Sequence, residues 1–374
     1  MTAMDERPQA NEGAGTDPLV SAAGQVLLAA RYGPELIRSA LRLVINPQRI
    51  RRRLEGHSET ATVLAEALTD VTEAPLGIDE PGVVKALRLM TMGDGYKVEK
   101  QVAYGPDKGQ TLDIWHGKDL DPTSPAPVLV FVPGGGWVTG TTTLQGNVLL
   151  GMLAARGWVC VSIGYRTAPS NRWPAHIEDV KRGLAWVHRN IAAHGGDPGR
   201  IVISGASAGG HIAALCGLTQ NHPGYQPGFE DEPTAVNAVV GLYGRYCWEN
   251  RDTPERRGFM SFLEKVVVGV PQHVVPDLYA AASPMRQAGP HAPPFFVIHG
   301  RSDAAIPVWQ AREFVDKLRA VSQQPVVYAE LPGTGHGFDI VDPFRASHMA
   351  RAVALFIQAV EAAPAASAPV AASR

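Results

Sequence analysis

The sequence predicts an α/β protein whose central sheet is mostly parallel and is covered by helices on both faces. Short runs of apolar, β-branched residues alternate along the chain with longer segments of helical patterning, which is the order of strands joined by crossover helices. These runs are continuously apolar, as expected of strands that are buried on both sides. Several of them end in glycine-rich loops, and in such sheets ligands bind at the carboxyl ends of the strands.

The composition provides for a large core and excludes one class of partner. Apolar residues make up 45% of the 374 residues, and the formal net charge is only −2. No basic excess is available to neutralise phosphates, so we expect no nucleic-acid partner. The three cysteines are odd in number and lack close spacing, which argues against a disulfide framework or a zinc site and fits a reducing compartment: Cys160, Cys216 and Cys247.

The first 95 residues are predicted to lie outside the catalytic core. Residues 1–17 are polar and acidic, are predicted to be disordered, and lack the basic start of a signal peptide. Residues 18–95 are predicted to form helices that cap the core, and their apolar stretch from Leu19 to Ala30 is too short to span a membrane. The sequence therefore predicts a cytoplasmic location. The arginines from Arg49 to Arg53 leave a second interpretation, in which an amphipathic anchor lies on a membrane surface.

Residues 96–361 are predicted to form the catalytic domain. It opens with a hairpin, because residues 96–104 and 111–115 alternate in polarity and a Gly-Pro-Asp turn separates them. Residues 245–285 interrupt the rhythm with charged and aromatic residues, which indicates a helical insertion that adds to the cap. The Ala/Pro/Ser-rich residues 362–374 are predicted to be a disordered tail. We expect further strands at 128–132, 159–163, 201–203, 236–242, 294–299 and 324–330, and helices at 144–156, 175–193, 211–215, 309–321 and 343–362.

The segment from Ile201 to Leu215 predicts a nucleophile elbow. A short apolar strand passes through Gly-Ala-Ser-Ala-Gly into helix-compatible residues, and a G-x-S-x-G match in this context is the signature of the α/β-hydrolase fold. Glycines are needed there because the strand and helix backbones converge too closely for β-carbons. Ser207 is therefore the candidate nucleophile. The amide of Ala208 stands at a helix N-terminus, where an unpaired N–H group can face a developing oxyanion.

A serine hydroxyl needs a base and an acid that orients the base. His336 lies in a glycine-rich loop after the last predicted strand, on the correct edge of the sheet, although an exposed turn histidine is the alternative interpretation. Asp303 directly follows a buried strand and is the candidate acid. Its rival, Asp339, lies only three residues from His336, from where it would struggle to reach the ring. The chain order of Ser207, Asp303 and His336 is that of α/β-hydrolase triads.

A second glycine-rich loop, Pro133–Trp137, follows the strand expected beside the elbow strand. Its three consecutive glycines allow backbone N–H groups to point into the site without obstruction by side chains. A phosphate-binding loop is the competing interpretation, but no Gly-Lys-Ser/Thr follows it; a purely structural turn also stays open. The aromatic residues that adjoin the two glycine loops, Trp137 and Phe338, are predicted to bind substrate.

Several separate motifs together resemble the hormone-sensitive-lipase-like branch of bacterial α/β-hydrolase carboxylesterases. The resemblance covers about residues 104–360, and the motifs occur in the order of that family. They are Gly105-Pro106-Asp107 before Leu112-Asp113, Gly134–Trp137, Tyr165–Pro169, Trp173–Ala175 with Glu178-Asp179, Gly205–Gly210, His299–Asp303 with Pro307, and His336–Phe338.

This resemblance implies a serine esterase without a cofactor, whose oxyanion donors are the amides of Gly135, Gly136 and Ala208. It also implies that the N-terminal helices form part of a cap over the acyl pocket. The sequence departs from the family at two positions. Pro133 replaces a histidine that braces the glycine loop, which removes no amide donor but leaves the loop geometry open. Ala206 replaces the common Asp or Thr before the serine, which leaves the sub-branch open.

The sequence favours a serine esterase that cleaves small to medium acyl esters through an acyl-enzyme, with a small molecule or a lipid as the ester. An arylformamidase-like amide hydrolase would use the same triad, so the sequence does not separate these two activities. A non-catalytic protein of this fold that binds a small ligand under its cap is disfavoured, because the histidine of the triad is present.

Overall fold

The computed structural model describes residues 47–74, 96–118, 124–142 and 145–362. The chain divides into two compact units, Met1–Glu55 and Gly56–Arg374, and of the first unit only the start of helix α2 (Pro47–Leu68) is described. The predictions for residues 1–46, 75–95 and 363–374 lie outside the described residues. The second unit holds the sheet and all predicted site residues.

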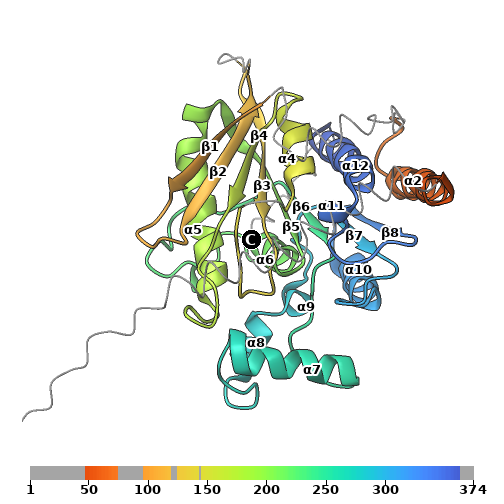
Figure 1. Ribbon diagram of the computed structural model, residues 1–374. Coiled ribbons are helices and arrows are strands. Elements are labelled where there is room, and N and C mark those ends of the chain that lie inside the picture. Colours follow the sequence, from red (N-terminus) through yellow and green to blue (C-terminus); the bar gives the residue numbers. More distant parts are fainter. Residues whose placement is uncertain (1–46, 75–95, 119–123, 143–144, 363–374) are drawn as a thin grey trace, which may run out of the picture. The chain divides into compact units, whose positions relative to one another are not determined.

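An eight-stranded sheet forms the core of this unit, in the order β1-β2-β4-β3-β5-β6-β7-β8 (Figure 1). β1 and β2 form the predicted hairpin, β2 pairs antiparallel with β4, and all other neighbours are parallel. The prediction of a mostly parallel sheet is therefore confirmed. The strands are β1 (Tyr96–Ala103), β2 (Thr111–Gly117), β3 (Ala126–Val132), β4 (Val159–Ile163), β5 (Gly196–Ala206), β6 (Ala238–Leu242), β7 (Phe295–Gly300) and β8 (Val326–Leu331).

The alternation of side chains along the strands builds a separate core on each face of the sheet. In β3, Val128, Val130 and Val132 belong to one apolar cluster, whereas Leu129 and Phe131 belong to the other. The first cluster includes residues of α5, α6 and α10, and the second includes residues of α2, α4 and α12. Both faces are covered by helices, as predicted. These helices are α4 (Asn147–Ala154), α5 (Ala175–Asn190), α6 (Ala208–Leu218), α10 (Trp309–Val321) and α12 (Pro343–Ala362).

The structure corrects some predicted boundaries and confirms the bounds of α10 and α12. Strand β5 begins at Gly196 rather than Ile201, because Gly196 pairs with Ala126 and the next residues bulge before Ile201 resumes the register. Residues 197–200 are thus part of the strand. The helix predicted at 144–156 spans only Asn147–Ala154, since Gly146 adopts a left-handed conformation (φ 75°) at its N-cap. A short helix that the sequence did not predict, α11 (Phe338–Val341), follows the histidine loop.

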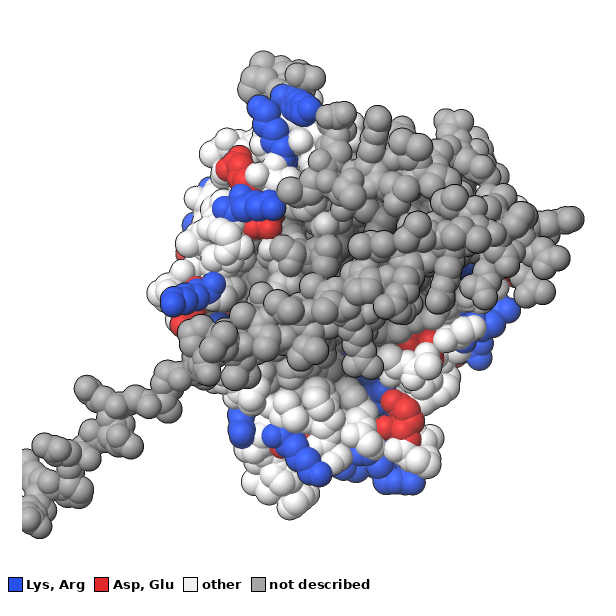
Figure 2. Space-filling view, in the orientation of Figure 1, with Lys and Arg blue, Asp and Glu red and all other residues white. Residues whose placement is uncertain are grey.

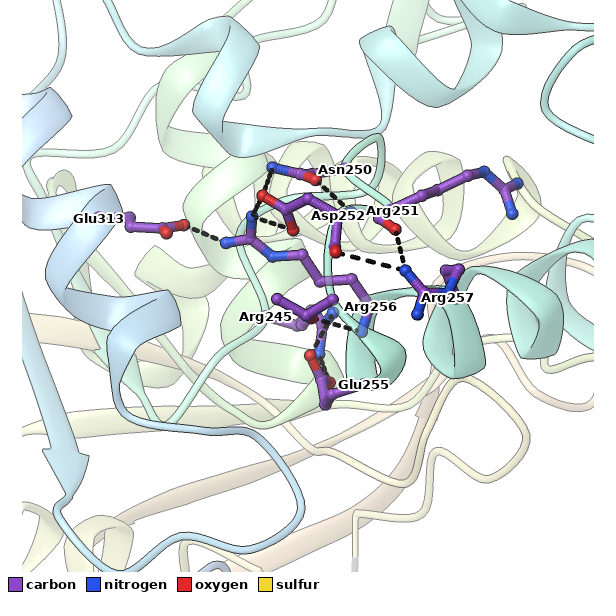
Figure 3. Close-up of polar contacts among 9 residues, drawn as sticks. Arg245, Asn250, Arg251, Asp252, Glu255, Arg256, Arg257 and Glu313 are labelled. Carbon is purple, nitrogen blue, oxygen red and sulfur yellow. Dashed lines mark hydrogen bonds and ion pairs between the residues drawn. The ribbon is translucent and has the colours of Figure 1, made fainter.

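Residues 245–285 form the predicted helical insertion. Figure 3 shows how arginines fasten it: Arg256 reaches Glu313 on α10, and Arg245 pairs with Glu255 at the start of α7. Both guanidinium groups are almost fully buried, so these ion pairs are protected from solvent on the arginine side. The pair of Arg256 and Glu313 ties the insertion to α10, and the pair of Arg245 and Glu255 lies within the insertion. The insertion contains α7 (Pro254–Phe262), a π-helical turn (Leu263–Val267) and α8 (Pro276–Ala281), and it leads into α9 (Pro284–Gln287).

Charges of both signs are distributed over the surface. Figure 2 shows acidic and basic side chains interspersed over the described part of one face, in keeping with the small net charge of −2. Among the described residues, no helix is both long and apolar enough to cross a membrane, and no cluster of three or more His, Cys, Asp or Glu side chains could hold a metal ion.

Candidate active site

Ser207 lies on the sharp turn between β5 and α6, with the strained backbone angles φ 57° and ψ −119°. The glycines around it leave no room for side chains. A β-carbon on Gly205 would lie 2.2 Å from the carbonyl oxygen of Gly209, and one on Gly209 would lie 2.0 Å from that of Val132. The Ser207 amide donates to the carbonyl oxygen of Leu242 at 2.9 Å, which fixes the turn against β6. The local structure is the elbow that the sequence predicted.

The structure brings the three predicted triad residues together. Nε2 of His336 lies 3.0 Å from Oγ of Ser207, and Nδ1 of His336 lies 2.7 Å from Oδ2 of Asp303. A carboxylate only accepts hydrogen bonds, so in the neutral ring Nδ1 carries the proton and Nε2 is left to accept the serine proton. These side chains follow β5, β7 and β8, whose carboxyl ends share one edge of the sheet.

Asp303 is held as an anion in the protein interior. Its Oδ1 accepts the backbone N–H groups of Ala305 at 2.9 Å and Ile306 at 2.8 Å, and Nε2 of His299 lies 3.4 Å from its Oδ2. Burial raises the pKa of Asp303, but hydrogen bonds from His299 and His336 together with the backbone donors outweigh burial, and the net pKa lies well below its usual range. The carboxylate is therefore charged at neutral pH and can stabilise an imidazolium at His336.

Asp339, the rival acid, has other partners. The hydroxyl of Tyr243 donates to its Oδ1, and the amide of Gly146 donates to its Oδ2 at 3.2 Å. Both of its carboxylate oxygens are therefore hydrogen-bonded to groups other than His336, whose Nδ1 contacts Asp303 instead. The geometry agrees with the preference for Asp303.

The glycine loop after β3 lies against the elbow. A β-carbon on Gly134 would lie 3.0 Å from Cβ of Ser207. Gly135, Gly136 and Trp137 all have positive φ angles of 128°, 61° and 61°, and a β-carbon on Gly135 would lie 2.0 Å from Oγ1 of Thr139. The backbone thus comes close to Ser207 with no side chain in between, which is what an oxyanion loop requires.

Trp137 and Phe338 lie in the interior. Their side chains are only 3% and 2% exposed. Nε1 of Trp137 donates to Nδ1 of His211 at 3.3 Å, and the ring packs edge-on against Trp248 of the insertion. Phe338 packs edge-on against Tyr243. Their burial favours a packing role over the substrate contact that the sequence predicted.

The structure also places side chains around the site that the sequence analysis missed. Gln145 accepts the amide N–H of Gly134 at 2.5 Å, and the hydroxyl of Tyr165 donates to the carbonyl oxygen of Pro133 at 2.8 Å. Tyr243 lies edge-on to the ring of His336, with centroids 4.7 Å apart. Tyr243 directly follows the carboxyl end of strand β6 and so lies at the edge where the site forms, but no motif in the sequence assigned any of these three side chains to the site.

The fold and this arrangement of serine, imidazole and carboxylate define an α/β-hydrolase. The profile of the BD-FAE family matches residues 112–318. Esterase LipC of Mycobacterium tuberculosis is 47% identical over 341 residues, which cover 88% of this chain and 83% of LipC. The probable carboxylic ester hydrolase LipM of the same organism is 47% identical over 283 residues, which cover 75% of this chain and 65% of LipM.

A solved structure shares the fold at low sequence identity. Esterase 2 of the planctomycete Thermogutta terrifontis superimposes with a TM-score of 0.58 at 23% identity, over 72% of this chain and 92% of that protein. On the family match and the identity to LipC, the chain belongs to the BD-FAE family and is a carboxylic ester hydrolase.

Proposed function

We propose that this esterase is a serine hydrolase of the hormone-sensitive-lipase-like branch, which cleaves small to medium acyl esters through an acyl-enzyme on Ser207. The observation that carries the proposal is the hydrogen-bonded path from Asp303 through His336 to Ser207, with steps of 2.7 and 3.0 Å. Such a path lets the base remove the hydroxyl proton while the oxygen attacks carbon. The motifs at 134–137, 165–169 and 336–338 support the choice of branch.

In the acylation step, Oγ of Ser207 bonds to the ester carbonyl carbon while Nε2 of His336 takes its proton. The carbonyl π electrons move onto oxygen, and the amides of Gly135, Gly136 and Ala208 donate to the oxyanion. The intermediate collapses as the bond to the leaving alkoxide breaks, and His336 returns the proton to that oxygen. Asp303 keeps its negative charge throughout and stabilises the transient imidazolium.

In the deacylation step, water takes the place of the alcohol. His336 removes a proton from the water as its oxygen attacks the acyl carbon, and the same amides hold the second oxyanion. The carboxylic acid leaves as Oγ of Ser207 recovers its proton from His336. Apart from the ester and this water, both steps use side chains and amides of the chain itself.

The proposal includes a cap made of the N-terminal helical region and the insertion. Its support is Arg345, whose Nη1 donates to Oγ1 of Thr60 on α2 at 3.0 Å and to the carbonyl oxygen of Pro332 at 2.8 Å, near the loop of His336.

Contact of residues 18–53 with a membrane surface is a separate proposal, as is the cytoplasmic location. Sedimentation with anionic vesicles should fall when residues 18–53 are deleted; unchanged sedimentation would count against membrane contact.

The test of the central proposal is the hydrolysis of a short-chain aryl ester by the variant Ser207→Ala, which should lose activity by a factor on the order of 10⁴ or more. Ser204 provides a matched control, since it lies in β5 just before the turn of Ser207 and its hydroxyl has no hydrogen-bond partner among the described residues. Ser204→Ala should keep its activity. An unchanged rate for Ser207→Ala would end the proposal, and faster turnover of an arylformamide than of the ester would redirect it to amide hydrolysis.

A further inference from the structure

A ring of hydrogen bonds holds the start of the glycine loop, and the catalytic steps above do not use it. The amide N–H of Gly134 donates to Oε1 of Gln145 at 2.5 Å, and Nε2 of Gln145 donates to the hydroxyl of Tyr243 at 3.1 Å. This hydroxyl donates to Oδ1 of Asp339, whose Oδ2 accepts the amide N–H of Gly146 at 3.2 Å. Because Gly146 follows Gln145 in the chain, the ring closes on itself.

Tyr243 stands where this ring meets the histidine of the triad. Its side chain is fully buried, and its ring lies edge-on to those of His336 and Phe338, with centroids 4.7 and 5.4 Å away. Its amide donates to the carbonyl oxygen of Ile298 in β7 at 2.8 Å, so the sheet fixes its backbone. A buried hydroxyl that both donates and accepts a hydrogen bond is held in one orientation.

The glycine loop depends on such support from outside. Pro133 has no N–H group, and its carbonyl oxygen is its single polar atom, which Tyr165 binds. Gly135 and Gly136 have no side chains that could pack against a neighbour. On the far side, the carbonyl oxygen of Gly135 accepts the amides of Val138 and Thr139, each at 3.1 Å. On the near side, the direction of the loop amides depends on what holds the backbone before them, where the first amide available is that of Gly134.

We infer that Gln145, Tyr243 and Asp339 are positioning residues, which hold the amides of Gly135 and Gly136 in register with the triad. The inference rests on the proposed function, since it assigns the ring to the oxyanion loop of that same site. The ring supplies the bracing that Pro133 lacks. Since Asp339 lies at the start of α11, three residues after His336, and Tyr243 contacts both side chains, the ring couples the oxyanion donors to the base.

The test compares two variants that cut the ring without touching the triad. Tyr243→Phe removes only the hydroxyl and keeps the ring contacts with His336, and Gln145→Met removes both polar atoms at similar length. Each should lower kcat on a short-chain aryl ester at least about ten-fold while KM changes less than about three-fold, because misplaced donors weaken binding of the transition state. The double variant should be no slower than the slower single one, since both changes break the same ring.

Tyr104→Phe is the matched control, because it also removes a buried tyrosine hydroxyl, one that donates to the carbonyl oxygen of Gly164 at 2.7 Å. It should lower the melting temperature and leave kcat unchanged. The inference is overturned if Gln145→Met keeps the wild-type kcat, if the two losses multiply in the double variant, or if Tyr104→Phe loses kcat equally. Ser207→Ala in the same assay separates the two ideas: an inactive Ser207→Ala beside fully active ring variants refutes only the positioning role.

Discussion

Two buried histidines should make the protein lose stability in mild acid. Burial lowers the pKa of His211 to about 3 and that of His176 to about 4. Burial disfavours the charged form of both rings and outweighs the opposing effect of two hydrogen bonds, in which Nε2–H of His211 donates to the carbonyl oxygen of Ala282 at 2.7 Å and Nε2–H of His176 donates to that of Trp137 at 2.9 Å. In the unfolded chain these rings titrate near pH 6.5. Below that pH the unfolded state binds protons that the folded state does not, so stability falls as the pH falls.

The size of the loss follows from the two pKa values of His211. At pH ~4.5 the solution is about two pH units below the unfolded pKa and still above the folded pKa of about 3. Each pH unit in this window costs about 1.4 kcal/mol, so His211 alone should cost on the order of 2–3 kcal/mol of unfolding free energy. His176 should cost slightly less, because its folded pKa of about 4 is closer to that pH.

The assay is urea denaturation at about pH 7 and about pH 4.5, for the wild type and for His211→Gln. The glutamine offers an oxygen to Trp137 and an N–H to the carbonyl oxygen of Ala282, but it does not titrate. The wild type should lose about 2–3 kcal/mol more than the variant between these pH values. His176→Gln repeats the measurement at an independent site. If His211→Gln lost as much stability as the wild type, the ring would not be the group that takes up the proton.

Two further predictions concern the triad and the elbow. Asp303→Asn should lower kcat by about 10³–10⁴ with little change in KM, because an amide N–H facing Nδ1 favours the wrong tautomer; a loss below about ten-fold in steady-state kinetics would contradict this role. Gly209→Ala should lower the unfolding free energy by about 2 kcal/mol or more, since its β-carbon would lie 2.0 Å from the carbonyl oxygen of Val132. Gly258→Ala, where a β-carbon meets nothing within 4 Å, is the control and should be neutral or stabilising; equal urea midpoints for the two alanine variants would refute the steric argument.

The arrangement of Ser207, Asp303 and His336 could be predicted because residues that directly follow parallel strands lie at the same edge of the sheet. Ser207, Asp303 and His336 each follow a run of buried, β-branched or aromatic residues, and parallel strands deliver their following loops to one edge. The sequence also favoured Asp303 over Asp339. Only three residues separate Asp339 from His336, and so short a segment of backbone makes it difficult for the carboxylate to contact the imidazole ring. The same reasoning gave the alternating hairpin and the two-sided core.

The support of the glycine loop could not be predicted in this way. Gln145 and Tyr243 lie 98 residues apart in the chain, and neither a glutamine before a helix nor a tyrosine after a strand has a local signature. For Trp137 the sequence position was misleading. Its left-handed backbone, with φ 61°, turns the chain so that the indole packs against Trp248, 4.9 Å away. Adjacency to a motif does not tell which way a side chain points.

The loop is thus held on both sides by groups of different chemistry. Before it, the amide of Gly134 is bound by the uncharged amide of Gln145. After it, Trp137 donates to Nδ1 of His211, a bond that needs a neutral ring, and its carbonyl oxygen accepts from Nε2–H of His176. Protonation of His211, whose folded-state pKa is about 3, would therefore weaken the second support and leave the bond to Gln145 intact. A histidine at position 133 would place a ring that titrates near neutral pH directly beside the donors, whereas Pro133 places no such ring there.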